Sequence, residues 1–388
     1  MSKIPLHGGD LVAASQRYGI AINEWIDLST GLNPNAYPVG ELTADVFSAL
    51  PYLQFEFSQQ VKSYYGQKDF LAVAGSQQII QLLPDCLPAF SLLAPQYGYR
   101  EYVDCWLRAG CELELYPSLC QREAQQAIDK ALVIDGARHL LLINPNNPTG
   151  ITFSTKKIMA WAQLLHRDAY LIVDEAFMDI TPEQSLLAGE LPDNVIVLRS
   201  FGKFFGLAGI RLGFVFCNHL MLKRFSQRCG LWSINGPAQA IAIKALADVA
   251  WQLKTRRWLS QANTVTQSLF APLFNTLALR IVTAELFFSV ILEKNSAVQI
   301  YEFFASRGLL LRLHQLNNQT HLLRIGLVNI DDPDFEIGTI RSLMNPSSYD
   351  HPEVYEGENW YTGLDDNGGV HTNSGVQNHW FFLNFVTY

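Results

Sequence analysis

The sequence predicts an α/β fold with a mostly parallel central sheet and a smaller α+β domain after it. Between about residues 70 and 220, short apolar runs alternate with amphipathic stretches. Apolar runs of this length, bounded by Gly, Pro and Asn, are typical of strands that are covered on both faces. Because the runs alternate with helical patterns, we expect the sheet to bind its ligands at the carboxyl ends of its strands.

Each strand is expected from one apolar run. The runs of the large domain lie at 71–74, 140–143, 170–173, 195–198 and 213–216. From about 237 to 258 the apolar spacing is helical. This stretch leads into the smaller domain, whose strands we expect near 287–292 and 322–327.

Composition and charge exclude several classes of protein. The chain has 388 residues, of which 49% are hydrophobic and 16% charged, as in an ordinary globular protein. A formal charge of −8 argues against non-specific binding of nucleic acid. The six cysteines lack C-x-x-C spacing, so we interpret them as reduced thiols and expect no metal site. We see neither an apolar signal region nor a run of the roughly 20 apolar residues that a membrane helix needs, and therefore expect a cytoplasmic protein without a membrane partner.

The segment 200–213 carries the most informative chemistry of the chain. Lys203 stands there among small and apolar residues, and a lysine amine can form an imine with an aldehyde. Ser200 could donate to a phosphate, and the planar guanidinium of Arg211 could pair with the same group. Pyridoxal 5'-phosphate (PLP) carries both an aldehyde and a phosphate, so the segment predicts this cofactor. Taken singly, the lysine could be a solvated surface charge and the arginine a member of a surface salt bridge.

Polar residues also follow other predicted strands. Asp174 follows the run at 170–173, where a carboxylate could keep a pyridine nitrogen protonated, although a helix N-cap is an alternative. Asn147 lies in the turn 144–150, which has two X-Pro steps, and its amide could donate to a phenolate oxygen. A plain turn would explain these residues equally well if the motif stood alone.

Two further segments could contact the same cofactor. The residues Gly75, Ser76 and Gln77 open a predicted helix, whose free N–H groups could cradle a phosphate or be satisfied by a simple N-cap. Tyr97 follows another apolar run and could stack on a planar ring, or it could be a core tyrosine.

In the order in which they follow one another along the chain, from Gly75 to Arg211, these motifs resemble the class I/II aminotransferase family of PLP enzymes, over roughly residues 5–343. The resemblance implies the PLP-dependent transferase fold of type I and a homodimer with its active site at the subunit boundary. It implies that Lys203 forms the Schiff base and shuttles protons, that Asp174 holds the pyridine nitrogen and that Asn147 holds the ring oxygen. The remaining cofactor contacts that it implies are Gly75, Ser76, Gln77, Tyr97, Ser200 and Arg211.

The N-terminal segments 7–10 and 26–34 resemble one branch of this family, whose members decarboxylate threonine phosphate in cobalamin biosynthesis. The resemblance implies that L-threonine O-3-phosphate is decarboxylated to aminopropanol phosphate. An aminotransferase of the histidinol-phosphate type is the alternative. The substrate contacts that it implies are His7, Gly8, Asn147, Arg312 and Arg324, the last of these for the substrate carboxylate.

Four positions depart from the family pattern. Phe177 stands where many relatives have tyrosine, and Gly202 replaces a common Ser or Thr before the lysine. Leu50 stands where relatives often have a tyrosine that reaches the partner subunit's phosphate. After Arg312 the chain reads Leu-His-Gln-Leu at 313–316, in place of the usual loop with a cysteine.

The C-terminal residues change in character from about Asn345. The segment 363–375 resembles part of a thermolysin-like zinc metallopeptidase, in which the matching Asp366 and His371 would help to stabilise an oxyanion. The chain contains no H-E-x-x-H motif, so we expect neither zinc nor peptidase activity. We hypothesise that a fusion, a frameshift or an assembly artefact replaced the natural C-terminus.

These observations divide the chain into four segments. Residues 1–40 form an N-terminal arm with substrate contacts, and 41–258 form the large PLP-binding domain. Residues 259–343 form the small domain, and 344–388 are the anomalous tail.

Overall fold

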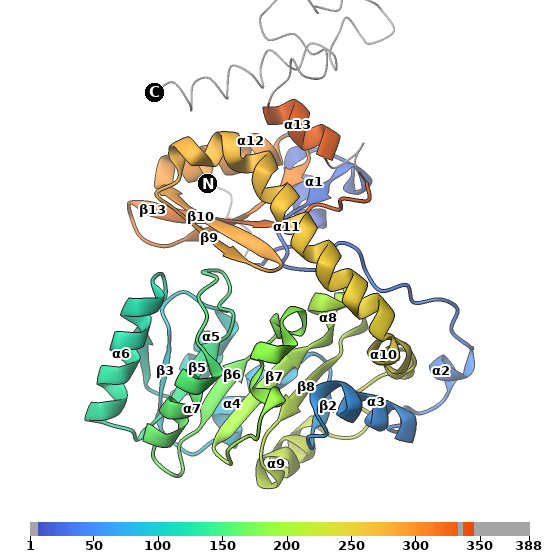
Figure 1. Cartoon of the computed structure of the whole chain (residues 1–388), viewed down its shortest axis with the longest axis vertical. Helices are drawn as coiled ribbons and strands as arrows, with labels where there is room; N and C mark the ends of the chain where they lie inside the picture. Colours follow the sequence, from blue (N-terminus) through green and yellow to red (C-terminus); the bar gives the residue numbers. More distant parts are fainter. Residues whose placement is uncertain (1–6, 333–336, 345–388) are drawn as a thin grey trace, which may run out of the picture. The chain divides into compact units, whose positions relative to one another are not determined.

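The computed structural model describes residues 7–332 and 337–344 (Figure 1). The chain divides into two compact units. The large-sheet unit is Asn35–Arg256, and the small-sheet unit combines Met1–Pro34 with Arg257–Tyr388.

A seven-stranded sheet forms the centre of the large-sheet unit, with the strand order β2-β8-β7-β6-β5-β3-β4. The strands are β2 (Leu71–Val73), β3 (Ser91–Pro95), β4 (Leu113–Tyr116), β5 (Arg138–Ile143), β6 (Leu171–Asp174), β7 (Val195–Ser200) and β8 (Gly213–Phe216). Only β8 is antiparallel to its neighbours, β2 and β7. The mostly parallel sheet predicted from the sequence is therefore confirmed.

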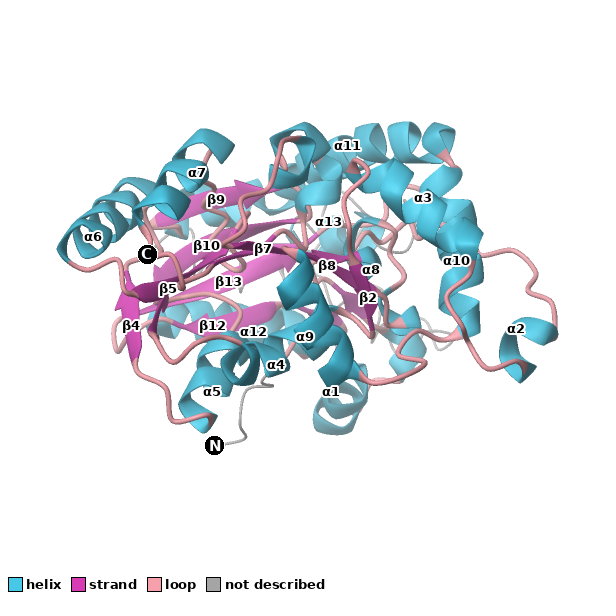
Figure 2. Cartoon of the chain, turned by 90° about the horizontal axis from the view of Figure 1, so that it is seen from below, coloured by secondary structure: helices cyan, strands magenta, loops and turns pink. Residues whose placement is uncertain are grey.

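Helices cover both faces of this sheet. Figure 2 shows α4, α5 and α9 on one side and α6 and α7 on the other. The helices of the unit are α2 (Asp45–Ser48), α3 (Phe55–Tyr65), α4 (Ser76–Cys86), α5 (Glu101–Arg108), α6 (Gln121–Ile134), α7 (Thr155–Leu164), α8 (Phe201–Phe204), α9 (His219–Cys229) and α10 (Gly236–Ala247). Short 3-10 turns lie at Met178–Ile180, Pro182–Gln184, Leu186–Ala188 and Ala208–Ile210. Every residue of β5, β6 and β8 is buried, which explains the apolar runs that these strands contain at 140–143, 171–173 and 213–216.

The helical stretch predicted at 237–258 is two helices, because α10 ends at Ala247 and α11 (Val249–Leu277) begins after one residue. That residue, Asp248, accepts a hydrogen bond from the backbone N–H of Trp251 (2.9 Å). A carboxylate in this position caps the start of the new helix, so the apolar spacing continues across a real break.

The small-sheet unit contains a four-stranded antiparallel sheet with the order β12-β13-β10-β9. Its elements are α1 (Leu11–Tyr18), a 3-10 turn (Ile22–Glu24), β1 (Ile26–Asp27), β9 (Arg280–Ala284), β10 (Phe287–Glu293), α12 (Lys294–Ala305), β11 (Leu309–Leu310), β12 (Arg312–Gln315), β13 (Thr320–Gly326) and α13 (Gly338–Met344). Strands β1 and β11 pair in parallel as a separate two-stranded sheet. The two strands expected near 287–292 and 322–327 correspond to β10 and β13.

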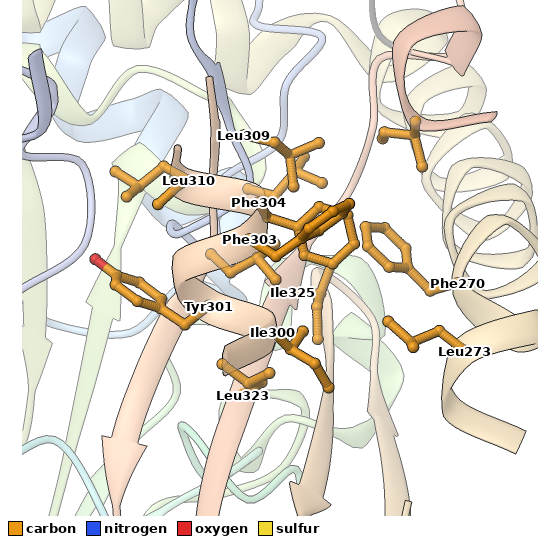
Figure 3. Close-up of a cluster of buried hydrophobic side chains, with 14 of the residues drawn as sticks. Phe270, Leu273, Ile300, Tyr301, Phe303, Phe304, Leu309, Leu310, Leu323 and Ile325 are labelled. Carbon is orange, nitrogen blue, oxygen red and sulfur yellow. The ribbon is translucent and has the colours of Figure 1, made fainter. Parts of the chain in front are cut away.

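One face of the four-stranded sheet carries the core of this unit (Figure 3). Leu323 and Ile325 of β13 pack there with Phe270 of α11 and Phe304 of α12, all of them at most 1% exposed. Because side chains alternate along a strand, Leu322 and Arg324 of β13 lie on the other face.

Candidate active site

The polar residues predicted from the sequence follow strands that end at one edge of the large sheet. Since β8 is antiparallel to both β2 and β7, strand β2 runs in the same direction as β7. In the register of the sheet, Asp174 lies opposite Ile143 and Leu198, and Gly213 lies opposite Val73 and Ser200. The carboxyl ends of β2, β5, β6 and β7 therefore meet at a common edge.

Backbone packing brings the start of α4 against Gly213 and Arg211. A Cβ atom on Gly213 would lie 2.6 Å from the backbone nitrogen of Ser76. A Cβ atom on Gly75 would lie 2.4 Å from Nη2 of Arg211. Gly75 also has a φ of +78°, which favours glycine. Ser200, which pairs with Gly213, ends β7 next to the same place. Two glycines thus let a helix N-terminus, a serine and a guanidinium come together, and this combination suits an anion.

Asp174 ends β6 and is 5% exposed. Its Oδ2 accepts a hydrogen bond from the Tyr102 hydroxyl (2.9 Å), and its Oδ1 accepts one from the backbone N–H of Ala176 (3.0 Å). Burial raises the pKa of this carboxyl, while the Tyr102 and Ala176 hydrogen bonds and the charge of Lys203 act in the opposite direction. A carboxylate has about four lone-pair sites, so these contacts leave capacity for a further donor.

Lys203 lies on the single turn of α8, and its Nζ is 5.7 Å from the ring centroid of Phe177. Its positive charge also acts on the carboxyl of Asp174. Gly202 has a packing reason, because a Cβ atom there would lie 2.7 Å from Cα of Ala208. A side chain at position 202 would therefore collide with the backbone of the 208–210 turn.

One side chain fixes the loop of Asn147 to the segment of Tyr97. The Nδ2 of Asn146 donates to the backbone oxygen of Tyr97 (2.7 Å) and to Oγ1 of Thr149. Tyr97 is held a second time, because its backbone N–H donates to Oγ of Ser118 (2.7 Å). Asn147 and Tyr97 are both half-buried, and their backbones are tied to one another through these bonds.

Two observations differ in detail from what the motifs indicate. The side chain of Gln77 is engaged away from the helix terminus, with Oε1 accepting from the Tyr99 hydroxyl and Nε2 donating to Glu101 (both 2.9 Å). Gln77 therefore contributes only its backbone N–H to the anion-binding start of α4, because its side chain is engaged elsewhere. Sequence reasoning also missed Tyr102, because its position in α5 carries no signal for a contact with a carboxylate 72 residues away.

Four of the substrate contacts expected from the sequence lie in the small-sheet unit, and the fifth, Asn147, belongs to the large-sheet unit. His7, Gly8 and Arg312 line one small pocket together with Ser29. Arg324, which is 6% exposed, donates through Nη2 to the backbone oxygen of Ser29. Burial and, to a lesser extent, the charge of Arg312 lower the pKa of Arg324 to about 10, although Asp27 acts in the opposite direction. These predicted residues therefore gather around Ser29.

Within residues 7–332 and 337–344, no helix is long and apolar enough to cross a membrane. The same residues contain no group of three or more His, Cys, Asp or Glu side chains that could hold a metal ion. Asp366 and His371, expected from the resemblance of the tail, lie outside the described residues.

Two family models match the chain. One, described as aminotransferase class I and II, matches residues 43–315. The other, described as thermolysin metallopeptidase, alpha-helical domain, matches residues 314–387. Both resemblances seen in the sequence are thereby confirmed. The described part of the second range includes β13 and α13 of the small-sheet unit.

Known proteins are similar over most of the described chain. The chain is 39% identical over 243 residues to threonine-phosphate decarboxylase of Pseudomonas aeruginosa. The aligned region covers 62% of this chain and 71% of the relative. It is 36% identical to threonine-phosphate decarboxylase of Sinorhizobium sp, and that aligned region covers 63% of this chain and 72% of the relative. A crystal structure of histidinol-phosphate aminotransferase from Sinorhizobium meliloti, in complex with pyridoxal-5'-phosphate, covers 88% of this chain and 95% of that chain. Its TM-score is 0.68 at 19% identity, so this likeness concerns the fold alone.

Proposed function

Since the chain belongs to the class I and II aminotransferases, we propose that it is a PLP-dependent enzyme that decarboxylates L-threonine O-3-phosphate to aminopropanol phosphate. One observation carries the proposal: Lys203, Asp174 and the anion cradle of α4 follow strands that end at one sheet edge. The two threonine-phosphate decarboxylases at 39% and 36% identity support the choice of substrate. An aminotransferase of the histidinol-phosphate type remains the second candidate.

The described residues fit PLP. The first turn of α4 presents backbone N–H groups close to Gly213, and we call this the anion cradle of α4. The guanidinium of Arg211 lies against Gly75 and supplies a positive charge beside it. Ser76, Ser200 and Arg211 would hold the cofactor phosphate, with the backbone of Gly75 and Gln77. Asp174 would hold the pyridine nitrogen, Asn147 the ring oxygen, and Tyr97 would stack on the ring.

When bound, PLP supplies an aldehyde for imine formation and a ring that takes up the electron pair left at the substrate Cα. Asp174 would keep a proton on the pyridine nitrogen, because a buried carboxylate is stabilised by a neighbouring positive charge. The hydrogen bonds from Tyr102 and Ala176 favour the ionised form of the Asp174 carboxyl, against the effect of burial, which raises its pKa. In decarboxylation the bond from Cα to the carboxylate breaks, CO₂ leaves, and Nζ of Lys203 would deliver a proton to Cα.

The choice between decarboxylation and transamination depends on how the substrate is gripped. The residues that hold the carboxylate and the phosphate fix the orientation of the substrate, and they would thereby decide which bond at Cα breaks. We assign this grip to Arg324 for the carboxylate and to Arg312, His7 and Gly8 for the rest of the substrate. If the Cα–H bond were the one to break, Nζ of Lys203 would accept that proton and the enzyme would transaminate.

We also propose a cytoplasmic homodimer. Exposed apolar residues of the large-sheet unit come from two segments, which we call the Tyr52 patch: Phe47, Leu50, Tyr52, Leu53, Phe55, Leu231 and Trp232. The rings of Tyr52 and Trp232 pack edge to face, with their centroids 6.1 Å apart. An exposed apolar patch of this kind is typical of an interaction surface. A second copy of this chain is its occupant in our proposal, in line with the family.

The experiment that tests the activity uses the PLP-loaded protein and O-phospho-L-threonine, with and without 2-oxoglutarate. We expect CO₂ and aminopropanol phosphate to form without any keto acid. Glutamate that forms only in the presence of 2-oxoglutarate would instead identify an aminotransferase. Lys203→Ala should abolish both the product and the visible absorbance band of the bound cofactor. Lys157→Ala, which removes a lysine paired with Asp129, is the matched control and should retain both.

A further inference from the structure

The face of the small sheet opposite the core of Figure 3 carries three nitrogen-containing side chains, those of Arg312, His314 and Arg324. Leu313 and Leu323 belong to the core on the other face. By alternation, Arg312 and His314 of β12 share a face with Arg324 of β13. Arg312 and Arg324 lie directly opposite each other in the register of the two strands. Two like charges in this position repel each other, so this part of the sheet is suited to a negatively charged ligand.

His314 differs from the other buried histidines of the described chain in its hydrogen bonds. His139 uses both ring nitrogens, with the backbone oxygen of Pro88 and the backbone N–H of Tyr170 each 2.9 Å away. His321 places Nδ1 2.8 Å from the oxygen of Thr320. His314 is half-buried as a residue, but its Nε2 is buried and has no hydrogen-bond partner among the described residues. A buried polar atom without a partner costs stability, and such an atom in a folded protein calls for an explanation.

The surroundings of His314 favour its neutral form. Burial lowers the pKa of this imidazole well below its usual range, and the charges of Arg324 and Arg312 lower it further. A neutral imidazole can still donate one hydrogen bond from a ring N–H. A group of this kind adds a donor beside two arginines without adding a third positive charge.

We propose that His314 is a substrate-binding residue, whose Nε2–H donates to an oxyanion oxygen of the substrate beside Arg312 and Arg324. The proposal rests on the proposed function, because it takes an amino acid phosphate as the ligand. The oxygen belongs either to the phosphate or to the carboxylate of that substrate, and both present the same acceptor chemistry.

The test measures binding without turnover, by titrating PLP-loaded protein and following the change in the absorbance of the cofactor. Aminopropanol phosphate carries the phosphate without the carboxylate, and L-threonine carries the carboxylate without the phosphate. His314→Leu removes the donor at similar volume, and His314→Gln keeps an N–H donor near the position of Nε2. We expect His314→Leu to raise the dissociation constant of one of the two ligands about tenfold, as for a hydrogen bond to a charged group. His314→Gln should stay within about threefold of the parent, because it retains that donor.

Two controls separate binding from folding. His321→Leu removes a buried imidazole from the opposite face of the same sheet and should leave both dissociation constants unchanged. Without ligand, His314→Leu should melt no lower than the parent, because it removes a buried nitrogen that lacks a partner. Unchanged binding of both ligands, equal losses in His321→Leu, or a His314→Leu protein that is unstable or unfolded would each overturn the proposal. The outcome is independent of the reaction, because an enzyme that binds these ligands but releases no CO₂ would refute only the proposed function.

Discussion

Asp174 combines a functional position with an electrostatic cost. Burial raises its pKa above the ordinary value of 3.8. The folded apoprotein therefore binds a proton at this carboxyl more tightly than the unfolded chain does. The stability that protonated Asp174 contributes is fully present below the unfolded pKa and is lost as the pH rises through the raised folded pKa.

This linkage gives a prediction for Asp174→Asn, which stays uncharged at every pH. Relative to the parent apoprotein, the free energy of unfolding of the variant should increase as the pH is raised from about 4 to 8. Denaturant titrations of both apoproteins across this range measure it, and a difference that does not change with pH would contradict it. The PLP-loaded variant should lose about 10²-fold or more of its rate of CO₂ release, because the proton on the pyridine nitrogen loses its partner.

Single residues of the site could be predicted from the sequence when they follow an apolar run. Lys203, Asp174 and Ser200 all do so, and the sheet brings the ends of β6 and β7 together. Tyr102 could not be predicted, because its contact with Asp174 depends on how α5 packs on the sheet. The opposition of Arg312 and Arg324 was equally hidden, since it requires the register of β12 and β13.

At the scale of elements, the contact between β8 and the start of α4 depends on Gly213. A Cβ atom there would meet the backbone of Ser76 and Gly75, neither of which can move aside as a flexible side chain can. We expect Gly213→Ala to destabilise the protein by about 1–3 kcal/mol, as for overpacking, and to weaken PLP binding. Gly209→Ala is the matched control, because a Cβ atom at Gly209 would have no heavy atom within 4 Å. Equal PLP affinities of the two variants would argue against the cradle.

The ends of β6 and β7 are also joined by a buried ionic network on the opposite side from Asp174. Arg199 donates to Glu175 (3.0 Å) and to Asp179, and all three side chains are at most 1% exposed. Replacing Arg199 by Leu leaves two carboxylates buried without their cation. We expect a loss of about 3–5 kcal/mol in the free energy of unfolding, measured by urea titration.

A surface ion pair provides the comparison for this prediction. Lys62 and Asp69 are 3.0 Å apart with exposed side chains, so Lys62→Leu should cost less than about 1 kcal/mol. If Arg199→Leu were no worse than Lys62→Leu, the network would not stabilise the junction of β6 and β7.

Elements were predictable from the sequence in proportion to their burial. The strands β5 to β8 are almost wholly buried, and each appears as an apolar run. Strand β4 lies at the sheet edge and is only partly buried, so its residues Leu113–Tyr116 form no such run. The break between α10 and α11 was missed for a different reason, because one capping residue, Asp248, interrupts a continuous apolar spacing.

At the scale of the whole molecule, the Tyr52 patch distinguishes a monomer from a dimer. Its two segments are adjacent in the large-sheet unit, since a Cβ atom on Gly236 would lie 2.1 Å from the backbone oxygen of Val46. Tyr52 is 70% and Trp232 45% exposed, although together they form an aromatic pair. Burying such side chains against a second copy would contribute favourable free energy in proportion to the apolar area removed from water.

The double variant Tyr52→Glu, Trp232→Glu should therefore be monomeric, because it places two charges where apolar surface would be buried. Sedimentation velocity at several concentrations measures the mass of the parent and the variant. Val133→Glu with Ile134→Glu is the control, since these residues are 76% and 72% exposed at the end of α6, outside the patch. The monomer should also lose CO₂ release, because the resemblance implies an active site at the subunit boundary. If the parent sedimented as a monomer, or if the double variant stayed dimeric, the Tyr52 patch would not be the dimer interface. Another surface would then have to bring two copies together at the active site.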